Sequence, residues 1–237
     1  MEGSMKFVIA PSKTMVETTQ TPSTDPLFPH KRDDLLEGLA SMSVKQLMAL
    51  YSVNESIAVL NKERFMHFQE AHCAIFSYTG QQYKHKNLET LDKAALNHLS
   101  KNIYIMSGLY GLVRPFDRIG LYRMPMGVKW NGAPLKNFWK ETISEYLRGE
   151  TVVNLASKEY ADAIDRAVVD VIDVDFMVVK QGKRKRAGAM EAKKHRGRMI
   201  HFIATHHIEH IEALKDYAFE GMRFETHEAG RLVFSKQ

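Results

Sequence analysis

The stretch "NIYIMSGLYGLVRPFDRIGLYRMPMG", residues 102–127, shows most directly how this chain folds and where it gathers charge. Residues 102–106 are almost continuously apolar, which predicts a strand buried on both faces. Ser107, Gly108 and Gly111 follow directly, so the strand ends in a glycine-rich turn. Glycine allows backbone N–H groups to approach an anion closely, and this strand end is therefore a candidate phosphate contact.

Arginines among aromatic residues dominate the second half of the stretch. Arg114, Arg118 and Arg123 could each bind a phosphate through two parallel hydrogen bonds. A catalytic serine is less well supported, because the Gly-x-Ser-x-Gly pattern fails at Ile105, two residues before Ser107. We favour phosphate contact, and the alternative is an ordinary glycine turn with arginines on a solvated face.

Two further strands end in the same way. Residues 6–10, "KFVIA", predict a strand whose last four residues are apolar, and Lys13 follows it. Residues 151–156 are followed by Ser157 and Lys158. The carboxyl ends of neighbouring parallel strands meet at one edge of a sheet, where ligands bind in α/β proteins. We therefore expect the three strand ends to form one positively charged cleft.

The rest of the chain alternates between helical and strand patterns. We expect helices from Asp33, from Ser43, over 54–68, 90–100 and 135–148, after Ser157, and over 190–216. We expect further strands over 73–78, 168–180 and 222–235, and a long loop over 16–34. Strands mixed with helices predict an α/β or mixed α+β fold. Without internal repeats or a low-complexity linker, a single compact domain over residues 5–237 is the simplest organisation.

The charge distribution is more informative than the net charge. The chain has 237 residues, 44% of them apolar and 26% charged, and a net charge of +5. Residues 180–198 alone hold nine Lys and Arg and one Glu, or +8, which leaves −3 for the remainder. One concentrated basic segment on a slightly acidic body indicates a phosphate-rich partner such as DNA.

Composition also argues against several classes of protein. No apolar run approaches the roughly 20 residues that a membrane helix needs, and no signal peptide is expected. Residues 1–4 precede a second methionine and are interpreted as a remnant of cloning. A single cysteine, Cys73, rules out an internal disulfide and favours a reducing, cytoplasmic location.

Two histidines were weighed as metal ligands. His206 and His210 stand four residues apart and could share one helix face. No HExxH pattern is present, and no cysteine or aspartate lies nearby at ligand spacing. A solvated helix face is the favoured interpretation, and we expect neither a metal ion nor a cofactor.

Residues 43–65 are a candidate helix-hairpin-helix element. Leu50, Val53 and Ala58 match its apolar positions, whereas Ser52 and Asn54 stand where the motif has glycines. Both substitutes can cap a helix, and asparagine tolerates left-handed backbone angles. In this motif the hairpin amides bind a DNA phosphate without reading sequence. The alternative is an ordinary turn between two helices.

Several motifs together resemble one known family. "APSKT" (10–14), "SGLYGLVRPFD" (107–117), "LYRMPMG" (121–127), "VVNLASKEY" (152–160) and "AKKHRGRM" (192–199) occur in the same order in the YaaA family of bacterial peroxide stress resistance proteins. The resemblance spans nearly the whole chain. It implies a cytosolic protein that limits damage from intracellular iron. It also implies a cantaloupe-type fold with a positive cleft, a helix-hairpin-helix element and DNA binding.

The resemblance also transfers site residues by position. The matching positions are Lys13, Ser107, Arg114, Asp117, Tyr122, Arg123, Ser157, Glu159, Tyr160, Lys194 and Arg196. Two positions depart from the family pattern. Pro125 stands where an acidic residue is common, which weakens any acid–base role there. His195 replaces a small residue and could add a pH-dependent positive charge beside Lys194.

Two classes of function are compatible with these patterns. The first is a monomeric DNA-binding protein, acting on duplex or locally unpaired DNA, with Lys193, Lys194 and Arg196 as additional phosphate contacts. The second is a glycosylase-like enzyme that acts on a nucleotide or nucleobase, with Asp117 and Glu159 as acid and base. An iron-binding module is a weaker third class, since no clear iron ligands are present.

Overall fold

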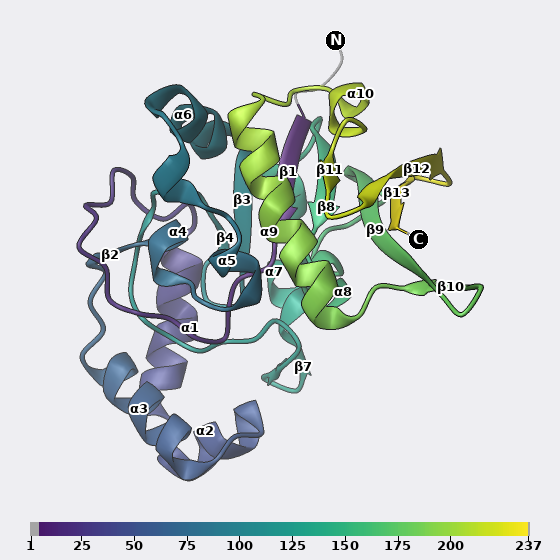
Figure 1. Cartoon of the computed structure of the whole chain (residues 1–237). Helices are drawn as coiled ribbons and strands as arrows, with labels where there is room; N and C mark the ends of the chain where they lie inside the picture. The colour runs from purple at the N-terminus through teal and green to yellow at the C-terminus, as the bar shows by residue number, and fades with distance from the viewer. Residues whose placement is uncertain (1–4, 237) are drawn as a thin grey trace.

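The computed structural model describes residues 5–236, and a nine-stranded sheet forms its centre (Figure 1). The segment 1–4, interpreted above as a cloning remnant, and residue 237 lie outside the described residues. Along the sheet the strand order is β11-β12-β13-β9-β8-β1-β3-β4, and β10 pairs with β9. The pairs β13–β9, β9–β8, β8–β1 and β1–β3 are all parallel.

The outer pairs of the sheet are antiparallel: β4 with β3, β12 with β13, β11 with β12, and β10 with β9. A parallel centre with antiparallel edges is the mixed α/β architecture that the sequence predicted. The bounds of the nine strands are β1 Met5–Ile9, β3 Ile103–Ser107, β4 Gly111–Val113, β8 Thr151–Leu155, β9 Asp170–Lys180, β10 Lys183–Arg186, β11 Ala218–Phe219, β12 Met222–Glu228 and β13 Arg231–Lys236.

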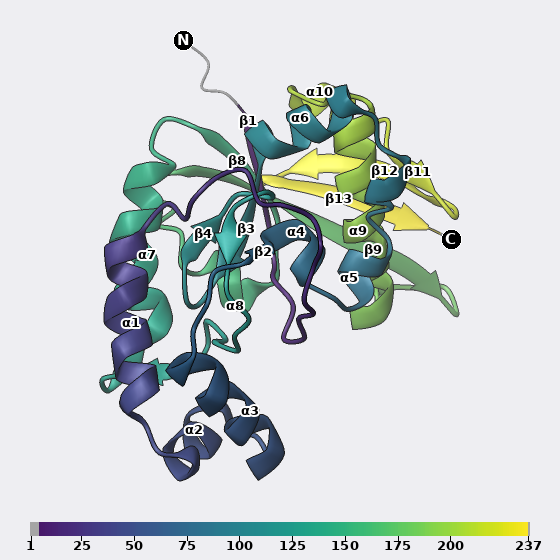
Figure 2. The ribbon, with the colours of Figure 1, turned by 90° about the vertical axis from the view of Figure 1, so that its left-hand side faces the viewer.

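Helices cover both faces of the parallel centre (Figure 2). On one face, helices α5 (Gln81–Lys84) and α6 (Lys93–Asn102) each contact α9 (Ala189–Thr205). Helices α1 (Pro29–Ser41) and α7 (Leu135–Tyr146) lie on the other. The shorter helices are α4 Ala74–Ser77, α8 Lys158–Ala161, α10 Ile211–Leu214 and the 3-10 helix η1 Leu88–Thr90. Two small two-stranded sheets complete the fold. One pairs β2 (His72–Cys73) with β5 (Arg118–Ile119), and the other pairs β6 (Lys129–Trp130) with β7 (Ala133–Pro134).

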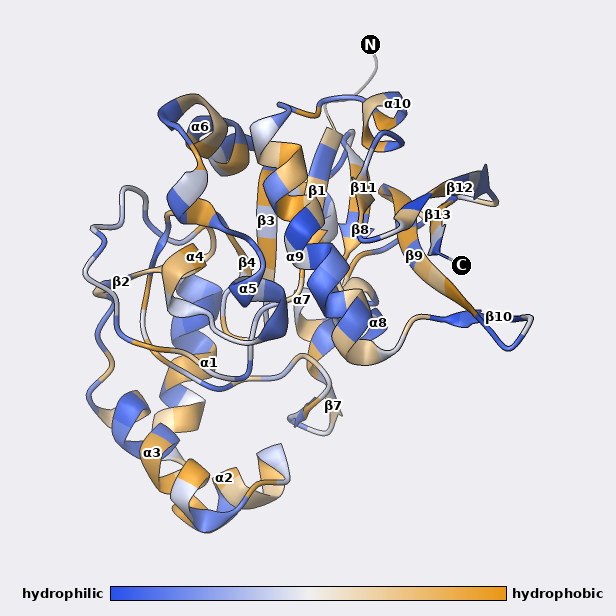
Figure 3. Ribbon diagram, in the orientation of Figure 1, coloured by the Kyte–Doolittle hydropathy of each residue, from blue (hydrophilic) through white to orange (hydrophobic). Residues whose placement is uncertain are grey.

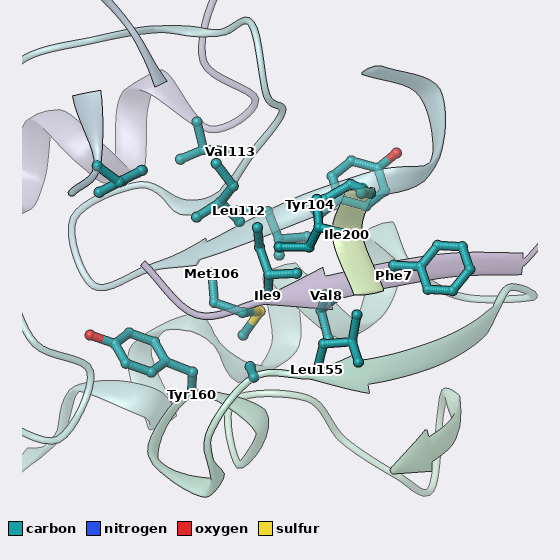
Figure 4. Packing of buried hydrophobic residues seen from close by; sticks show 14 of the residues in the cluster. Phe7, Val8, Ile9, Tyr104, Met106, Leu112, Val113, Leu155, Tyr160 and Ile200 are labelled. Atoms are coloured by element: carbon teal, nitrogen blue, oxygen red, sulfur yellow. The ribbon is translucent and has the colours of Figure 1, made fainter. Parts of the chain in front are cut away.

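The central strands are apolar because both of their faces are covered. Phe7 of β1 lies opposite Ile103 on one neighbour and Val153 on the other, and all three are fully buried. Figure 4 shows the side chains of β1 packed against those of β3 and β8, with Ile200 of α9 beside them. This continuous burial, rather than an alternating pattern, is what the sequence of these strands encodes.

Most predicted elements are confirmed, but the strand predicted over 73–78 is wrong. Only Cys73 belongs to a strand, and Ala74–Ser77 form the short helix α4. The Ser77 hydroxyl donates to the carbonyl of Cys73 at 2.9 Å, and Ala74 N–H donates to Asp117 O at 3.0 Å. A short apolar run that is buried all round carries no periodicity with which to separate strand from helix.

The single helix predicted over 190–216 is also wrong. Helix α9 ends at Thr205, His207 adopts a left-handed backbone with φ of 48°, and the short helix α10 begins at Ile211. His206 and His210 therefore do not share a continuous helix face. A left-handed residue after a helix is a common way to end it, and asparagine or histidine can adopt it without glycine.

The segment 43–65 forms two helices joined by a tight turn, at the lower end of the molecule in Figure 1. Helix α2 (Val44–Tyr51) is started by a capping box at Ser43, and α3 (Glu55–Met66) by the side chain of Asn54. Of the two residues that replace glycines, Ser52 takes the left-handed backbone (φ 51°), whereas Asn54 is extended. The hydroxyl of Tyr51 contacts the sulfur of Met124 at 3.6 Å, which joins the hairpin to the 121–127 segment.

Hydropathy along the ribbon follows this arrangement (Figure 3). Strand β10 is hydrophilic throughout and its four residues are exposed, whereas β1 and β3 carry the apolar core. Across residues 5–236, no helix combines the length and the apolar character that a membrane crossing would demand.

Candidate functional site

The ends of β1 and β8 border a pocket of about 350 Å³, called here the Lys13 pocket. The connection from β1 to β3 places α6 on one face of the sheet, and the connection from β3 to β8 places α7 on the other. Such a reversal creates a crevice beside the carboxyl ends of the strands, where α/β proteins bind ligands. The lining residues are Ala10, Pro11, Ser12, Lys13, Thr79, Gly80, Gln81, Gln82, Tyr83, Ser157, Glu159, Tyr160, Lys193 and Arg196.

Cations outnumber carboxylates around the Lys13 pocket. Its described lining contains Lys13, Lys193 and Arg196, and one carboxylate, Glu159. A small adjoining hollow is lined by Lys13 and Arg123 together, so two side chains that are 110 residues apart in the sequence share one surface. The pocket is therefore electropositive and suited to an anionic ligand.

Two hydrogen-bond donors on the wall of the Lys13 pocket lack a partner among the described residues. They are Nε of Arg196 and Nε2 of Gln82, and both atoms are buried. Burial also lowers the pKa of Arg196. A buried donor without a partner is costly, so a ligand or water that accepts from these atoms would relieve that cost.

Glu159 is held in place by the backbone. Its Oε1 accepts the N–H of Gly127 at 3.0 Å, and a Cβ on Gly127 would come within 3.2 Å of that same oxygen. Glycine at position 127 thus lets the 121–127 segment approach α8. Tyr160, the next residue, lines both hollows, and Tyr83 lines the Lys13 pocket while its hydroxyl donates to Ala10 O at 2.9 Å.

Ser107 and Gly108, expected at a phosphate contact, are instead packed in the interior. Ser107 is fully buried, and its Oγ lies 2.5 Å from the hydroxyl of Tyr122. That same Oγ accepts the backbone N–H groups of Leu109 and Tyr110 at 3.2 and 3.0 Å. A Cβ on Gly108 would come within 2.0 Å of the Met124 carbonyl oxygen. Glycine at position 108 therefore makes room for the backbone of the 121–127 segment, not for an anion.

Tyr122 belongs to a chain of buried hydroxyls. Its hydroxyl lies 2.6 Å from that of Tyr78 as well as 2.5 Å from Ser107. Burial raises the pKa of Tyr122 to about 12, and it also raises the pKa values of Tyr78, Tyr83 and Tyr110 well above the ordinary value of a tyrosine. These phenols are therefore protonated at neutral pH and act as hydrogen-bonding groups of the core.

We expect these tyrosines to make the protein sensitive to alkali. An unfolded tyrosine ionises near pH 10, whereas the buried phenols stay protonated to higher pH, so the stabilising effect is complete below pH 10 and is lost as the pH rises toward 12. Absorbance at 295 nm and far-ultraviolet circular dichroism should change together between pH 10 and 12. Tyrosine ionisation centred on pH 10 with unchanged circular dichroism would contradict this prediction.

Asp117 and Arg114 bind each other rather than facing the Lys13 pocket. Asp117 is fully buried, and its carboxylate accepts from the Thr24 hydroxyl at 2.6 Å, from Arg114 N–H at 2.7 Å and from Arg114 Nε at 2.8 Å. Burial raises the pKa of Asp117, and these hydrogen bonds oppose the rise. With its oxygens occupied in this way, Asp117 holds the 114–117 turn, and the geometry does not pair it with Glu159.

The basic run 180–198 divides into parts with different surroundings. Lys193 and Arg196 line the Lys13 pocket. Lys194 instead forms an ion pair with Glu220 and lies 5.5 Å from the centre of the Phe219 ring. The residues of β10 belong to a separate strand that pairs with β9, where Arg184 forms an ion pair with Glu225 at 3.0 Å.

His195 does not add a positive charge to this surface. It is fully buried, stacks on Phe176 and has its Nδ1 3.0 Å from the hydroxyl of Tyr217. Burial lowers its pKa, so the ring is neutral at physiological pH. The larger side chain at this position fills the space between α9 and the sheet.

Of the remaining candidate site residues, one lines the Lys13 pocket and three do not. Ser157 is the N-cap residue of α8 and lines the Lys13 pocket, whereas Lys158 is exposed and pairs with Asp162 at 2.9 Å. Ser52 and Asn54 are exposed on the hairpin and are not among the residues that line the pocket.

The segment Thr79–Tyr83 is the part of the pocket that the sequence analysis missed. It follows α4 and places Gln82 against the middle of α9. The sequence signal that could have indicated this wall is Gly80, a turn-forming residue shortly after the apolar run 73–78. A Cβ on Gly197 would come within 2.2 Å of Gln82 O, so glycine on α9 permits this close contact.

Cys73 has no features of a redox sensor. Its side chain is fully buried, and burial raises the pKa of the thiol to about 11. The thiolate, which is the form that reacts with oxidants, is therefore scarce at neutral pH.

Comparison with known proteins places this chain in a family. Residues 5–228 match the family described as peroxide stress protein YaaA. A UPF0246 protein of Rickettsia conorii is 35% identical over 248 residues, covering 98% of this chain and 100% of that protein. A UPF0246 protein of Finegoldia magna is 32% identical and covers 98% of each chain. This chain therefore belongs to the YaaA family of peroxide stress proteins, as its motifs predicted.

Proposed function

We propose that this protein is a cytoplasmic DNA-binding protein of the peroxide stress response, which protects DNA from iron-driven oxidation. The observation that carries the proposal is the Lys13 pocket. Lys13, Arg123, Lys193 and Arg196 surround one carboxylate there, and the buried Nε atom of Arg196 has no partner among the described residues. Guanidinium and ammonium groups without protein partners are suited to phosphates of a nucleic acid backbone.

The basic side chains of the pocket carry the proposal of a nucleic acid ligand, because they can contact its phosphates. Tyr83 and Tyr160 also stand on the wall, but both are buried and shape the pocket rather than presenting a free ring face to a base. The α2–α3 hairpin extends this surface in our proposal and acts as a helix-hairpin-helix element. It is joined to the 121–127 segment through the contact of Tyr51 with Met124.

Salt dependence tests the proposal most directly. Each phosphate contact contributes about 0.9 to the slope of log affinity against log salt on duplex DNA. The double variant Lys13→Gln/Lys193→Gln should therefore flatten the slope by nearly 2 and weaken binding equally for unrelated sequences. Binding should be measured on duplex, single-stranded and bubble DNA.

Lys194→Gln is the matched control, because Lys194 follows Lys193 on the same helix but is paired with Glu220. It should keep the wild-type slope. A Lys13/Lys193 variant with unchanged slope and affinity would remove these residues from any phosphate contact and reject the proposed surface.

A second candidate is an enzyme that acts on a nucleobase. The observation that favours it is Glu159, the one carboxylate among the described lining residues, which is oriented by the N–H of Gly127 and flanked by Tyr160. A flipped base would enter the pocket beside Glu159, which would act as the general acid or base. Incubation with DNA containing oxidised bases should then release base or nick the strand, and Glu159→Gln should abolish the product but keep binding.

A further inference from the structure

A second hollow, of about 520 Å³, shares Arg196 with the Lys13 pocket. We call it the Asp175 pocket. It lies past the end of β8, between α8, the middle of β9 and the N-terminal end of β13. Its lining residues are Asn154, Ala156, Lys158, Ala161, Asp162, Arg166, Asp173, Val174, Asp175, Arg186, Arg196 and Arg231.

The charges of the Asp175 pocket do not balance. Five cationic side chains and three carboxylates line it, an excess of two positive charges. Four of these side chains neutralise each other in two ion pairs: Arg166 binds Asp173 at 2.8 Å, and Lys158 binds Asp162 at 2.9 Å. The excess therefore belongs to the remaining cluster around Asp175.

Three arginines surround the single carboxylate of Asp175. Arg186 and Arg231 reach its Oδ2 at 3.3 and 3.0 Å from strands β10 and β13. Arg196 of α9 is within electrostatic range of the same carboxylate, yet its buried Nε has no hydrogen-bond partner among the described residues. Three guanidinium groups around one carboxylate provide more N–H donors than that carboxylate can accept.

We propose that the Asp175 pocket binds a phosphate dianion, either inorganic phosphate or the phosphate group of a phosphomonoester. The dianion matches the two excess charges, and the planar guanidinium groups of Arg186, Arg196 and Arg231 match its oxygens. The volume of the pocket lies in the range of small-molecule sites. Asp175 holds the arginines in place when the pocket is empty and competes with the ligand for them. The proposal does not require that the Lys13 pocket bind DNA.

Isothermal titration calorimetry at constant ionic strength tests the site, with inorganic phosphate and adenosine monophosphate as separate probes. Arg186→Gln/Arg231→Gln should weaken phosphate binding by about tenfold or more, because charge-assisted hydrogen bonds are lost. Both side chains are largely exposed, so this variant should fold. Arg148→Gln, which removes an exposed arginine paired with Glu145 elsewhere, is the matched control and should bind as wild type.

The variant Asp175→Asn should change the phosphate affinity in the opposite direction. Removing the competing carboxylate should strengthen phosphate binding severalfold, whereas a purely structural Asp175 would make the same variant bind more weakly. Tighter binding of adenosine monophosphate than of inorganic phosphate would identify a nucleotide as the ligand class, and equal affinity would identify free phosphate.

The charge of the ligand provides an independent test. The second pKa of a phosphomonoester is about 6, so its affinity should fall between pH 7.5 and 5.5, while sulfate, a dianion throughout, should keep its affinity. Wild-type affinity in the double arginine variant, or weaker binding in Asp175→Asn, would overturn the proposal.

Discussion

Replacing Asp117 with alanine is expected to lower the free energy of unfolding by about 3–5 kcal/mol, the usual loss when one partner of a buried ion pair is removed. The carboxylate is fully buried and accepts three hydrogen bonds from Thr24 and Arg114. Without it, the Thr24 hydroxyl and the backbone N–H of Arg114 lose their acceptor in the interior. Urea denaturation followed by circular dichroism measures the effect.

Glu145→Gln is the control for Asp117, since its ion pair with Arg148 is exposed on both sides. Its effect should be much smaller than that of Asp117→Ala, because solvent screens an exposed ion pair. A third variant, Asp117→Asn, tests whether Asp117 acts on a ligand. Assayed well below its melting temperature, it should retain DNA binding. Near-normal stability of Asp117→Ala together with loss of function would show that the residue acts on a ligand after all.

Gly108→Ala is expected to cost about 3 kcal/mol or more, at the upper end of the range for overpacked interiors. The new Cβ would lie 2.0 Å from the Met124 carbonyl oxygen, and backbone cannot move aside as a side chain can. The Gly108 carbonyl also accepts the indole N–H of Trp139 at 2.8 Å, so a shift would break that bond too. Thermal and urea denaturation should both register the loss.

Gly188→Ala is the matched control, because a Cβ at position 188 would meet nothing within 4 Å and the backbone φ is −59°. It should be neutral or stabilising by less than about 1 kcal/mol. If Gly108→Ala were equally mild, the interpretation that Gly108 is required by packing would be wrong, and a backbone–ligand contact would again be the better explanation.

Sequence alone determined the parts of this protein that depend on local pattern. The runs 7–10 and 103–106 are continuously apolar because helices cover both faces of these strands. Burial on both faces can therefore be recognised from the residue types alone. The capping residues Ser43 and Asn54 marked helix starts, since a cap needs only its own side chain and the next turn. The motifs around Arg114 and Ser157 indicated the family, which the comparisons then confirmed.

Tertiary structure alone decided which polar residues face a ligand. Ser107 and Asp117 look like site residues in sequence, but their oxygens are occupied by Tyr122, Thr24 and Arg114 in the interior. Lys193 and Lys194 are adjacent and chemically identical, yet a helix turns each residue by about 100° from the last, so one lines the pocket and the other pairs with Glu220.

The wall formed by Gln82 could not be predicted for a related reason. Its place depends on the close approach of α5 to Gly197 of α9, over 100 residues away. Local pattern determines which elements form and which of their faces are apolar. Contacts between distant elements determine which charges remain without a protein partner, and those charges are the ones available to a ligand.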